Sequence, residues 1–238
     1  MLAKPDETMK TIGIVGGIGP ESTVDYYKLL IAAYLERRSD DSYPQVIINS
    51  VDMRKLVRIM NANDLTQLVD WLVAEVQKLA NAGAEIGLVA SNTPHIVFDE
   101  LSSRSAIPLV SIVEATCEAA QKMRLTKLGL FGSRFTMQSR FYADVFSRKG
   151  IEVVVPAQDE QAWIHAHYMD ELVYGIFLAE TRDRFIAIAQ RIRAQDGIQA
   201  LILGGTELPL LLRDVDCGIP YLDTAKIHVD AVMAAAMV

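Results

Sequence analysis

The sequence predicts an α/β protein of two pseudo-symmetric domains with parallel sheets, related by an internal duplication. Three pairs of segments support this prediction. Residues 12–16 recur as 128–132, the polar segments 90–95 and 204–209 correspond, and Ile107-Pro108 recurs as Ile219-Pro220. The pairs keep the same order at separations of 112 to 116 residues, which indicates a repeated unit.

Apolar strand segments alternate with helical segments in both halves. Leucines at helical spacing over 65–79 predict a helix that ends at Gly83, and a second such helix ends at Gly197. Continuous apolar strands between amphipathic helices are typical of a parallel sheet covered on both faces, so each domain is expected to be Rossmann-like. The expected strands are 11–15, 46–51, 86–89, 108–112, 127–131, 152–155, 200–203 and 221–222.

The repeat also predicts the domain boundaries. The first domain is expected to comprise residues 10–116 with 222–238, and the second residues 117–221. Residues 1–9 are expected to lie outside the fold. A duplication of this kind places two equivalent strand ends opposite each other, so a ligand should bind between the halves. The pocket should lie at the low end of the usual ~300–1,000 Å³.

Composition limits the class of protein. A hydrophobic fraction of 51% with 22% charged residues is ordinary for a soluble chain, and a net charge of −7 disfavours nucleic acid or an anionic membrane as a partner. A small anionic substrate stays compatible, because local backbone N–H groups can bind it. Only Cys117 and Cys217 are present, which suits a reducing cytoplasm. No secretory signal or membrane-spanning stretch is visible, so a cytoplasmic location is expected.

A glycine-rich loop, Gly16-Gly17-Ile18-Gly19, follows the first strand, and Pro20 then begins a helix. Free N–H groups in such a loop can hold a carboxylate or a phosphate. The spacing fits neither a dinucleotide-binding loop nor a Walker loop. Gly17 is therefore a candidate substrate contact, and the alternative is that the glycines only permit a tight turn.

The chain resembles the aspartate/glutamate racemase family from about residue 10 to 235. The resemblance implies two pseudo-symmetric α/β domains, a homodimer, and cofactor-independent racemisation of an acidic amino acid or a related small dicarboxylate. No cofactor and no metal are expected. The matching residues are Gly16-Gly17-Ile18-Gly19-Pro20, Asn92-Thr93-Pro94-His95, Thr136-Met137, Tyr142, Gly204 with Thr206-Glu207, and Asp223-Thr224.

The sequence departs from the family pattern at both positions that carry a catalytic thiol. In the family a cysteine precedes Asn-Thr and another precedes Thr-Glu, and the two thiols face opposite sides of the substrate Cα. Ser91 and Gly205 stand at these positions here. A serine hydroxyl is a poor base without an activating partner, and glycine has no side chain at all. The two-thiol mechanism therefore cannot operate in this chain.

His95 and Glu207 are the candidates for substitute chemistry. His95 lies four residues after Ser91 and could orient or deprotonate it, or could make only a structural hydrogen bond. Glu207 lies two residues after Gly205, and its alternative role is to match the positive start of a helix.

The other candidate residues would bind substrate. Asn92, Thr93 and Thr206 are donors at helix starts that could hold a carboxylate, or could simply cap the helices. Arg54 is a possible carboxylate clamp, or a solvated arginine. The histidines at 165, 167 and 228 show no metal-ligand pattern. The remaining candidates for the substrate-binding set are Asp52, Met53, Ser133 and Thr136.

Several functions remain open at this point. The first is a racemase-like isomerase with reduced or altered chemistry. The second is a lyase or decarboxylase on the same scaffold, and the third is a catalytically silent dicarboxylate-binding protein. A fourth explanation of Ser91 and Gly205 is that they were introduced to trap a ligand.

Overall fold

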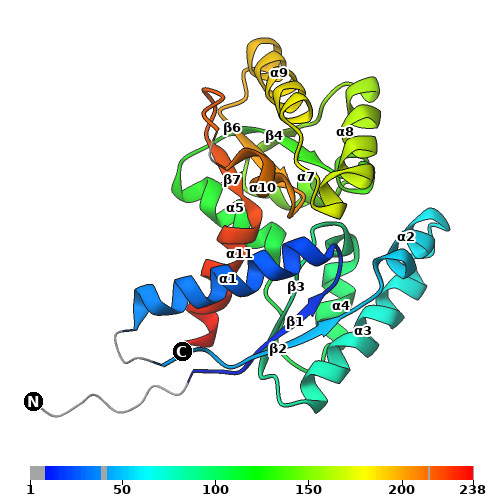
Figure 1. Cartoon of the computed structure of the whole chain (residues 1–238), viewed down its shortest axis with the longest axis vertical. Coiled ribbons are helices and arrows are strands. Elements are labelled where there is room, and N and C mark those ends of the chain that lie inside the picture. Colours follow the sequence, from blue (N-terminus) through cyan, green and yellow to red (C-terminus); the bar gives the residue numbers. More distant parts are fainter. Residues whose placement is uncertain (1–8, 39–41, 214, 238) are drawn as a thin grey trace, which may run out of the picture.

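The computed structural model describes residues 9–38, 42–213 and 215–237, and in these residues it has two parallel sheets, one in each half (Figure 1). The first sheet has the order β2-β1-β3 and the second the order β5-β4-β6-β7. This arrangement confirms the predicted fold class. The strands are β1 (Ile12–Gly16), β2 (Val46–Ser50), β3 (Ile86–Val89), β4 (Lys127–Gly132), β5 (Glu152–Val154), β6 (Ala200–Gly204) and β7 (Tyr221–Asp223).

Helices cover both faces of the first sheet. Its strands β1 and β3 are buried along their whole length, whereas β2 is only partly buried. Val15 and Val89 face a core formed with one set of helices, whereas Ile14 and Leu88 face the other set. The first set is α2 (Met53–Asn61), α3 (Leu65–Asn81), η1 (Thr93–Val97) and α4 (Phe98–Arg104). The second set is α1 (Pro20–Arg37) and α11 (Thr224–Ala236).

The second sheet is enclosed in the same way. Phe131 and Leu203 belong to the core on one face, and Leu130 and Ile202 to the core on the other. The first of these faces is covered by α8 (Gln158–Asp170), η2 (Leu172–Tyr174), α9 (Ala179–Asp196) and α10 (Leu208–Leu212). The other is covered by α5 (Ile112–Lys122) and α7 (Phe141–Ser147), and the short α6 (Arg134–Gln138) follows β4.

Two helices cross between the halves (Figure 1). β7 belongs to the second sheet, yet α11, which follows it directly, packs on the first sheet. In the reverse direction, α5 follows the elements of the first half in the sequence, yet it packs on the second sheet. Helices α5 and α11 also contact each other. The division into 10–116 with 222–238 and 117–221 stays a prediction.

The strand expected at 108–112 is reduced to a single bridge between Gly87 and Leu109. Helix α5 already begins at Ile112, and the Ser111 side chain caps it by accepting a hydrogen bond from the Glu114 N–H. A serine in this position favours a helix start over continued pairing, so the segment turns away from the sheet.

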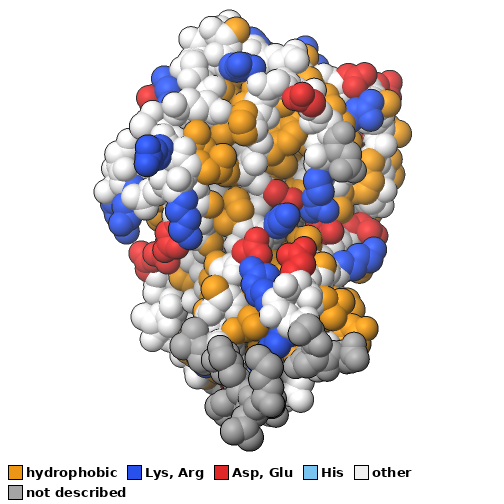
Figure 2. Space-filling model, turned by 90° about the vertical axis from the view of Figure 1, so that its left-hand side faces the viewer, with side chains coloured by type: hydrophobic (Ala, Val, Ile, Leu, Met, Phe, Trp, Pro, Cys, Tyr) orange, Lys and Arg blue, Asp and Glu red, His pale blue; other side chains and the backbone are white. Residues whose placement is uncertain are grey.

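Charges are mixed over the surface. On the face in Figure 2, basic and acidic side chains are interspersed, and neither sign forms a continuous patch. Within the described ranges, no helix has both the length and the apolar character needed to cross a bilayer.

Two buried histidines lie where the crossing segments meet. His228 on α11 accepts a hydrogen bond at Nδ1 from the Tyr26 hydroxyl and donates from Nε2 to the Val110 carbonyl oxygen. The His95 ring lies 5.9 Å from the His228 ring. Burial lowers the pKa of His228 from 6.5 to about 4. Burial, together with the neighbouring His228, lowers the pKa of His95 to about 3.

Acidification should therefore destabilise the fold. Below pH 6.5 the unfolded chain protonates both histidines while the folded protein does not, so the unfolded state binds more protons. The free energy of unfolding should therefore decrease as the pH is lowered, with a slope approaching ~1.4 kcal/mol per pH unit for each histidine. Urea denaturation between pH 7.5 and 5.5 measures this slope. Replacing His228→Gln should reduce it, and an unchanged slope would show that His228 does not titrate in this way.

Candidate active site

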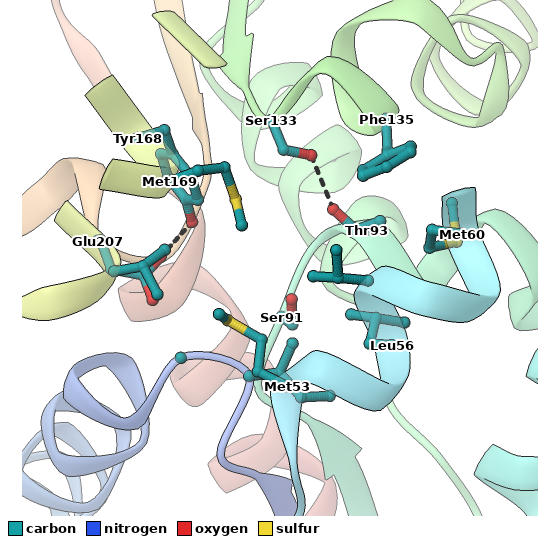
Figure 3. Close-up of a pocket in the computed structure, with 14 residues that line it drawn as sticks. Met53, Leu56, Met60, Ser91, Thr93, Ser133, Phe135, Tyr168, Met169 and Glu207 are labelled. Atoms are coloured by element: carbon teal, nitrogen blue, oxygen red, sulfur yellow. Dashed lines mark hydrogen bonds between the residues drawn. The ribbon is translucent and has the colours of Figure 1, made fainter. Parts of the chain in front are cut away.

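A narrow pocket lies between the halves, beside the ends of β3 and β6 (Figure 3). Its volume is about 40 Å³, so the expectation of a pocket near 300 Å³ is wrong for this conformation. Bulky side chains, above all Met53, Tyr168 and Met169, occupy the space. The lining residues are Ile18, Gly19, Met53, Leu56, Val57, Met60, Ser91, Thr93, Ser133, Phe135, Tyr168, Met169, Val173 and Glu207.

The end of β3 places hydroxyl groups in this pocket. Ser91 lies two residues after the end of β3 and lines the pocket. The Thr93 hydroxyl lies 3.0 Å from the Ser133 hydroxyl and 3.1 Å from that of Thr136, which joins the start of η1 to α6 (Figure 3). Thr136 is fully buried behind the other two. These neutral groups can donate to a carboxylate, but none of them is a strong base.

Asn92 has a different role from the one expected. Its amide donates to the Thr224 hydroxyl over 3.2 Å, and its oxygen accepts from the Tyr142 hydroxyl over 2.5 Å. Asn92 does not line the pocket. The side chain joins η1 to α7 and α11, so it orients the halves and is not placed to hold substrate.

His95 is not placed to activate Ser91. Its Nε2 accepts a hydrogen bond from the Ile112 N–H, which leaves Nδ1 protonated, and Nδ1 donates to the Ser91 carbonyl oxygen. Both ring nitrogens are therefore engaged by the main chain, and the ring lies outside the pocket. The expected base role does not fit this geometry, whereas the structural alternative does.

The end of β6 brings Tyr168 to the position that lacks a thiol. A Cβ atom added at Gly205 would lie 2.5 Å from Cε2 of Tyr168 and 2.9 Å from its hydroxyl oxygen. The ring, carried on α8, therefore fills the space that a side chain at 205 would need. Glycine at 205 and tyrosine at 168 are sterically matched.

Glu207 is the carboxyl group of the pocket. Its Oε2 accepts hydrogen bonds from the Tyr168 hydroxyl and, over 3.2 Å, from the Thr206 hydroxyl. The side chain is 1% exposed, and its Oε1 has no hydrogen-bond partner among the described residues. Burial raises the pKa of Glu207, although the hydrogen bond from Tyr168 opposes this shift. Thr206 thus supports Glu207 and does not line the pocket itself.

The glycine loop is mostly structural. The Gly17 N–H donates to the Thr23 hydroxyl over 2.8 Å, and its φ of +83° lies in the left-handed region. A side chain there would collide with the Val51 carbonyl. The N–H of Gly17 is thus not free for substrate, whereas Gly19 does line the pocket.

The segment after β2 contributes one wall. Met53 lines the pocket, but Asp52 caps α2 through the Arg54 N–H, and the Arg54 side chain is exposed outside the pocket. No Lys or Arg occurs among the pocket-lining residues that the structure describes. The arginine clamp expected for an acidic substrate is therefore not formed in this conformation.

The structure thus brings together five of the predicted residues: Met53, Ser91, Thr93, Ser133 and Glu207. Three further lining residues were not predicted from the sequence: Tyr168, Met169 and Val173, which come from α8 and η2. The one available signal was Gly205, because a missing side chain at a strand end leaves space that another residue must fill. Both cysteines lie in hydrophobic cores, and no cluster suited to a metal ion occurs in the described part of the chain.

This arrangement of sheets and strand ends agrees with a known family. The model of the Asp/Glu/hydantoin racemase family matches residues 15–232. The chain belongs to this family. The resemblance read from the sequence is confirmed, and so, at the level of the family, is the expectation of an amino-acid racemase, a type of isomerase.

Individual relatives agree with this assignment. The broad specificity amino-acid racemase RacX of Bacillus subtilis is 25% identical over 225 residues, covering 90% of this chain and 92% of the relative. An aspartate racemase homologue from Pyrococcus horikoshii is 34% identical with a TM-score of 0.82, covering 96% and 99% of the two chains. The aspartate racemase of Picrophilus torridus shares the fold at 22% identity, with a TM-score of 0.74 and coverage of 95% and 94%.

The steric match between Gly205 and Tyr168 can be measured. Gly205→Ala should lower the free energy of unfolding by ~1–3 kcal/mol, because the new methyl group overpacks the site. In a Tyr168→Ala background the cost should shrink, since the ring that the methyl group meets is gone. Urea denaturation of the four proteins in this double-mutant cycle gives the coupling. Equal costs in the two backgrounds would contradict the match.

Proposed function

We propose that this protein is a cofactor-independent, racemase-like isomerase of a small amino acid, with slow or altered chemistry. The observation that carries the proposal is that Ser91 and Glu207, from the two equivalent strand ends, line one pocket between the halves. In the resembling family these strand ends carry the two thiols. A substrate bound here would present its Cα to both.

The chemistry of the two sides is unequal. Glu207 and Tyr168 are the ionisable side chains that line the pocket, and both belong to the second half. On the other side stand hydroxyl groups without an activating base. One well-placed acid–base group typically contributes ~10²–10⁴-fold to a rate, so inversion without a base on the Ser91 side should be slow.

A lyase or decarboxylase is the second candidate, and the same observation favours it. Loss of a carboxylate from Cα needs one proton donor, whereas racemisation needs a group on each face. A pocket with ionisable side chains on one side meets the smaller requirement.

The pocket favours an uncharged substrate side chain over the expected aspartate or glutamate. Its walls are apolar, from Leu56, Val57, Met60 and Phe135, and none of its lining residues is a cation. A second carboxylate would lie near Glu207 without a counter-ion, at a cost in desolvation. The methionines are flexible enough to move aside for a ligand. The broad specificity of the Bacillus relative is compatible with this choice.

A substrate panel tests the proposal. L- and D-forms of alanine, serine, methionine, leucine, aspartate and glutamate are incubated with the protein and separated by chiral chromatography, and released amines and CO₂ are measured in parallel. Slow inversion of neutral amino acids is expected, with little turnover of aspartate or glutamate. Ser91→Cys should raise inversion at least ~10-fold, because a thiol ionises far more readily than a hydroxyl, whereas Ser91→Ala should not.

Preferential inversion of acidic amino acids would overturn the substrate choice and restore the one expected from the sequence. Decarboxylation without inversion would favour the second candidate. No binding of any of these compounds at millimolar concentration, measured by calorimetry, would overturn both.

We also propose a cytoplasmic homodimer. The two cysteines are unpaired and buried, which suits a reducing compartment. Apolar side chains are exposed on α1, at the end of η2 and just after it, among them Tyr27 at 47%, Tyr174 at 68% and Phe177 at 39%. Light scattering after size exclusion should give twice the chain mass, and Tyr27→Lys with Tyr174→Lys should shift it to a monomer. A monomeric mass for the unaltered protein would contradict the proposal.

A further inference from the structure

We propose that Glu207, held in place by Tyr168, carries the substrate's Cα proton on the face where Gly205 provides no thiol. This inference rests on the proposed function, since it assumes an amino acid in the pocket. It assigns the acid–base role to the carboxyl group and a positioning role to the phenol. No side chain at position 205 takes part.

The first support is the use of space. Tyr168 occupies the volume in which a thiol at 205 would stand, with its hydroxyl oxygen 2.9 Å from the place of the Cβ. That hydroxyl donates to Glu207 Oε2. The phenol of Tyr168, hydrogen-bonded to the carboxyl group of Glu207, therefore occupies the space of the missing thiol (Figure 3).

The second support is the unpartnered oxygen. Buried polar atoms in proteins nearly always have a hydrogen-bond partner, so an exception calls for an explanation. Glu207 Oε1 is such an exception, in a side chain that is 1% exposed and lines the pocket. Within the described residues, the other unpartnered buried atom is the Tyr221 hydroxyl, which lies outside this pocket. A substrate proton is a suitable partner for Oε1.

The third support is the glycine loop. A Cβ added at Gly19 would lie 2.9 Å from Glu207 Oε1. The absence of a side chain at 19 leaves room beside this buried oxygen. Gly19 and Gly205 thus keep clear the space around the carboxyl group and the ring that orients it.

The local electrostatics suit proton transfer. Burial raises the pKa of Glu207, which makes its carboxylate a stronger base than an exposed one, and a transfer group works best when its pKa approaches the working pH. Burial and the adjacent Glu207 raise the pKa of the Tyr168 phenol well above its ordinary value, so the phenol stays a hydrogen-bond donor.

Oε1 of the Glu207 carboxylate takes the Cα proton, and the C–H electron pair stays on the substrate, delocalised into its carboxylate. The protonated Glu207 then returns a proton to the same face, which regenerates the starting enantiomer. In D₂O the carboxyl proton exchanges with solvent, so the returned atom is deuterium. Proton delivery from the Ser91 side gives inversion instead.

The test follows Cα–H loss by proton NMR in D₂O and inversion by chiral chromatography, on the same samples. Exchange without inversion should outrun inversion in the unaltered protein. Glu207→Gln should lower exchange at least ~100-fold, and Tyr168→Phe should lower it by about 10-fold while leaving substrate affinity, measured by calorimetry, within about twofold.

Matched controls separate this role from a structural one. Glu75→Gln alters a buried carboxylate on α3, and Tyr221→Phe removes the buried hydroxyl of a half-buried tyrosine on β7. Both residues lie outside the pocket, and both changes should leave exchange unchanged. Glu207→Asp keeps the carboxyl group and should recover part of the exchange that Glu207→Gln loses. If Glu207→Gln does not fold, as judged by circular dichroism, Tyr168→Phe and Glu207→Asp decide the question.

The outcomes distinguish the two proposals. The role of the pair is overturned if Glu207→Gln retains the exchange seen in the unaltered protein. It is also overturned if Tyr168→Phe and Glu207→Asp both exchange at the full rate. Either result leaves the proposed function standing. Neither exchange nor inversion of any amino acid in the panel overturns the proposed function, and this inference with it.

Discussion

The geometry of the pocket depends on hydrogen bonds that cross between the halves at Asn92. Its amide reaches Thr224, whose hydroxyl in turn donates over 2.7 Å to the Leu203 carbonyl in β6, and its oxygen accepts from Tyr142. One side chain at the end of β3 is thereby fixed to the strand that precedes Gly205. All of these groups are buried, so breaking any of these bonds would leave a costly unpaired polar atom. The separation of the two strand ends is set by this constraint.

The side chains at the two strand ends differ in chemistry. The β3 end presents hydroxyl groups, and that of Thr93 is satisfied by Ser133 and Thr136, which follow β4. The β6 end presents a carboxyl group with one unsatisfied oxygen. Glu207 Oε1 is a buried pocket oxygen without a partner among the described residues, so it marks a place where a ligand would gain from binding.

The sequence predicted the fold and the two strand ends, because repeats, glycines and apolar strand runs are local signals. It also predicted Ser91, Thr93, Ser133, Met53 and Glu207 as pocket residues, since each follows a strand end. It failed where a distant partner decides the role. The donor group expected of Asn92 is engaged by Thr224, and the base expected of His95 is engaged by the main chain. Tyr168 enters from a helix whose packing no local pattern reveals.

The difference between the side chains on the two faces of the substrate limits which effects the site can have. Enantiomers have equal free energy in an achiral solvent, so no arrangement of Glu207 and Ser91 can favour one of them at equilibrium. The asymmetry can appear only in rates. With the roles proposed for Glu207 and Ser91, a strong acid–base group on one face and a weak hydroxyl on the other would make proton return to the same face faster than proton delivery to the opposite face. The partition between exchange and inversion therefore measures how unequal the two strand ends are as sources of acid–base groups.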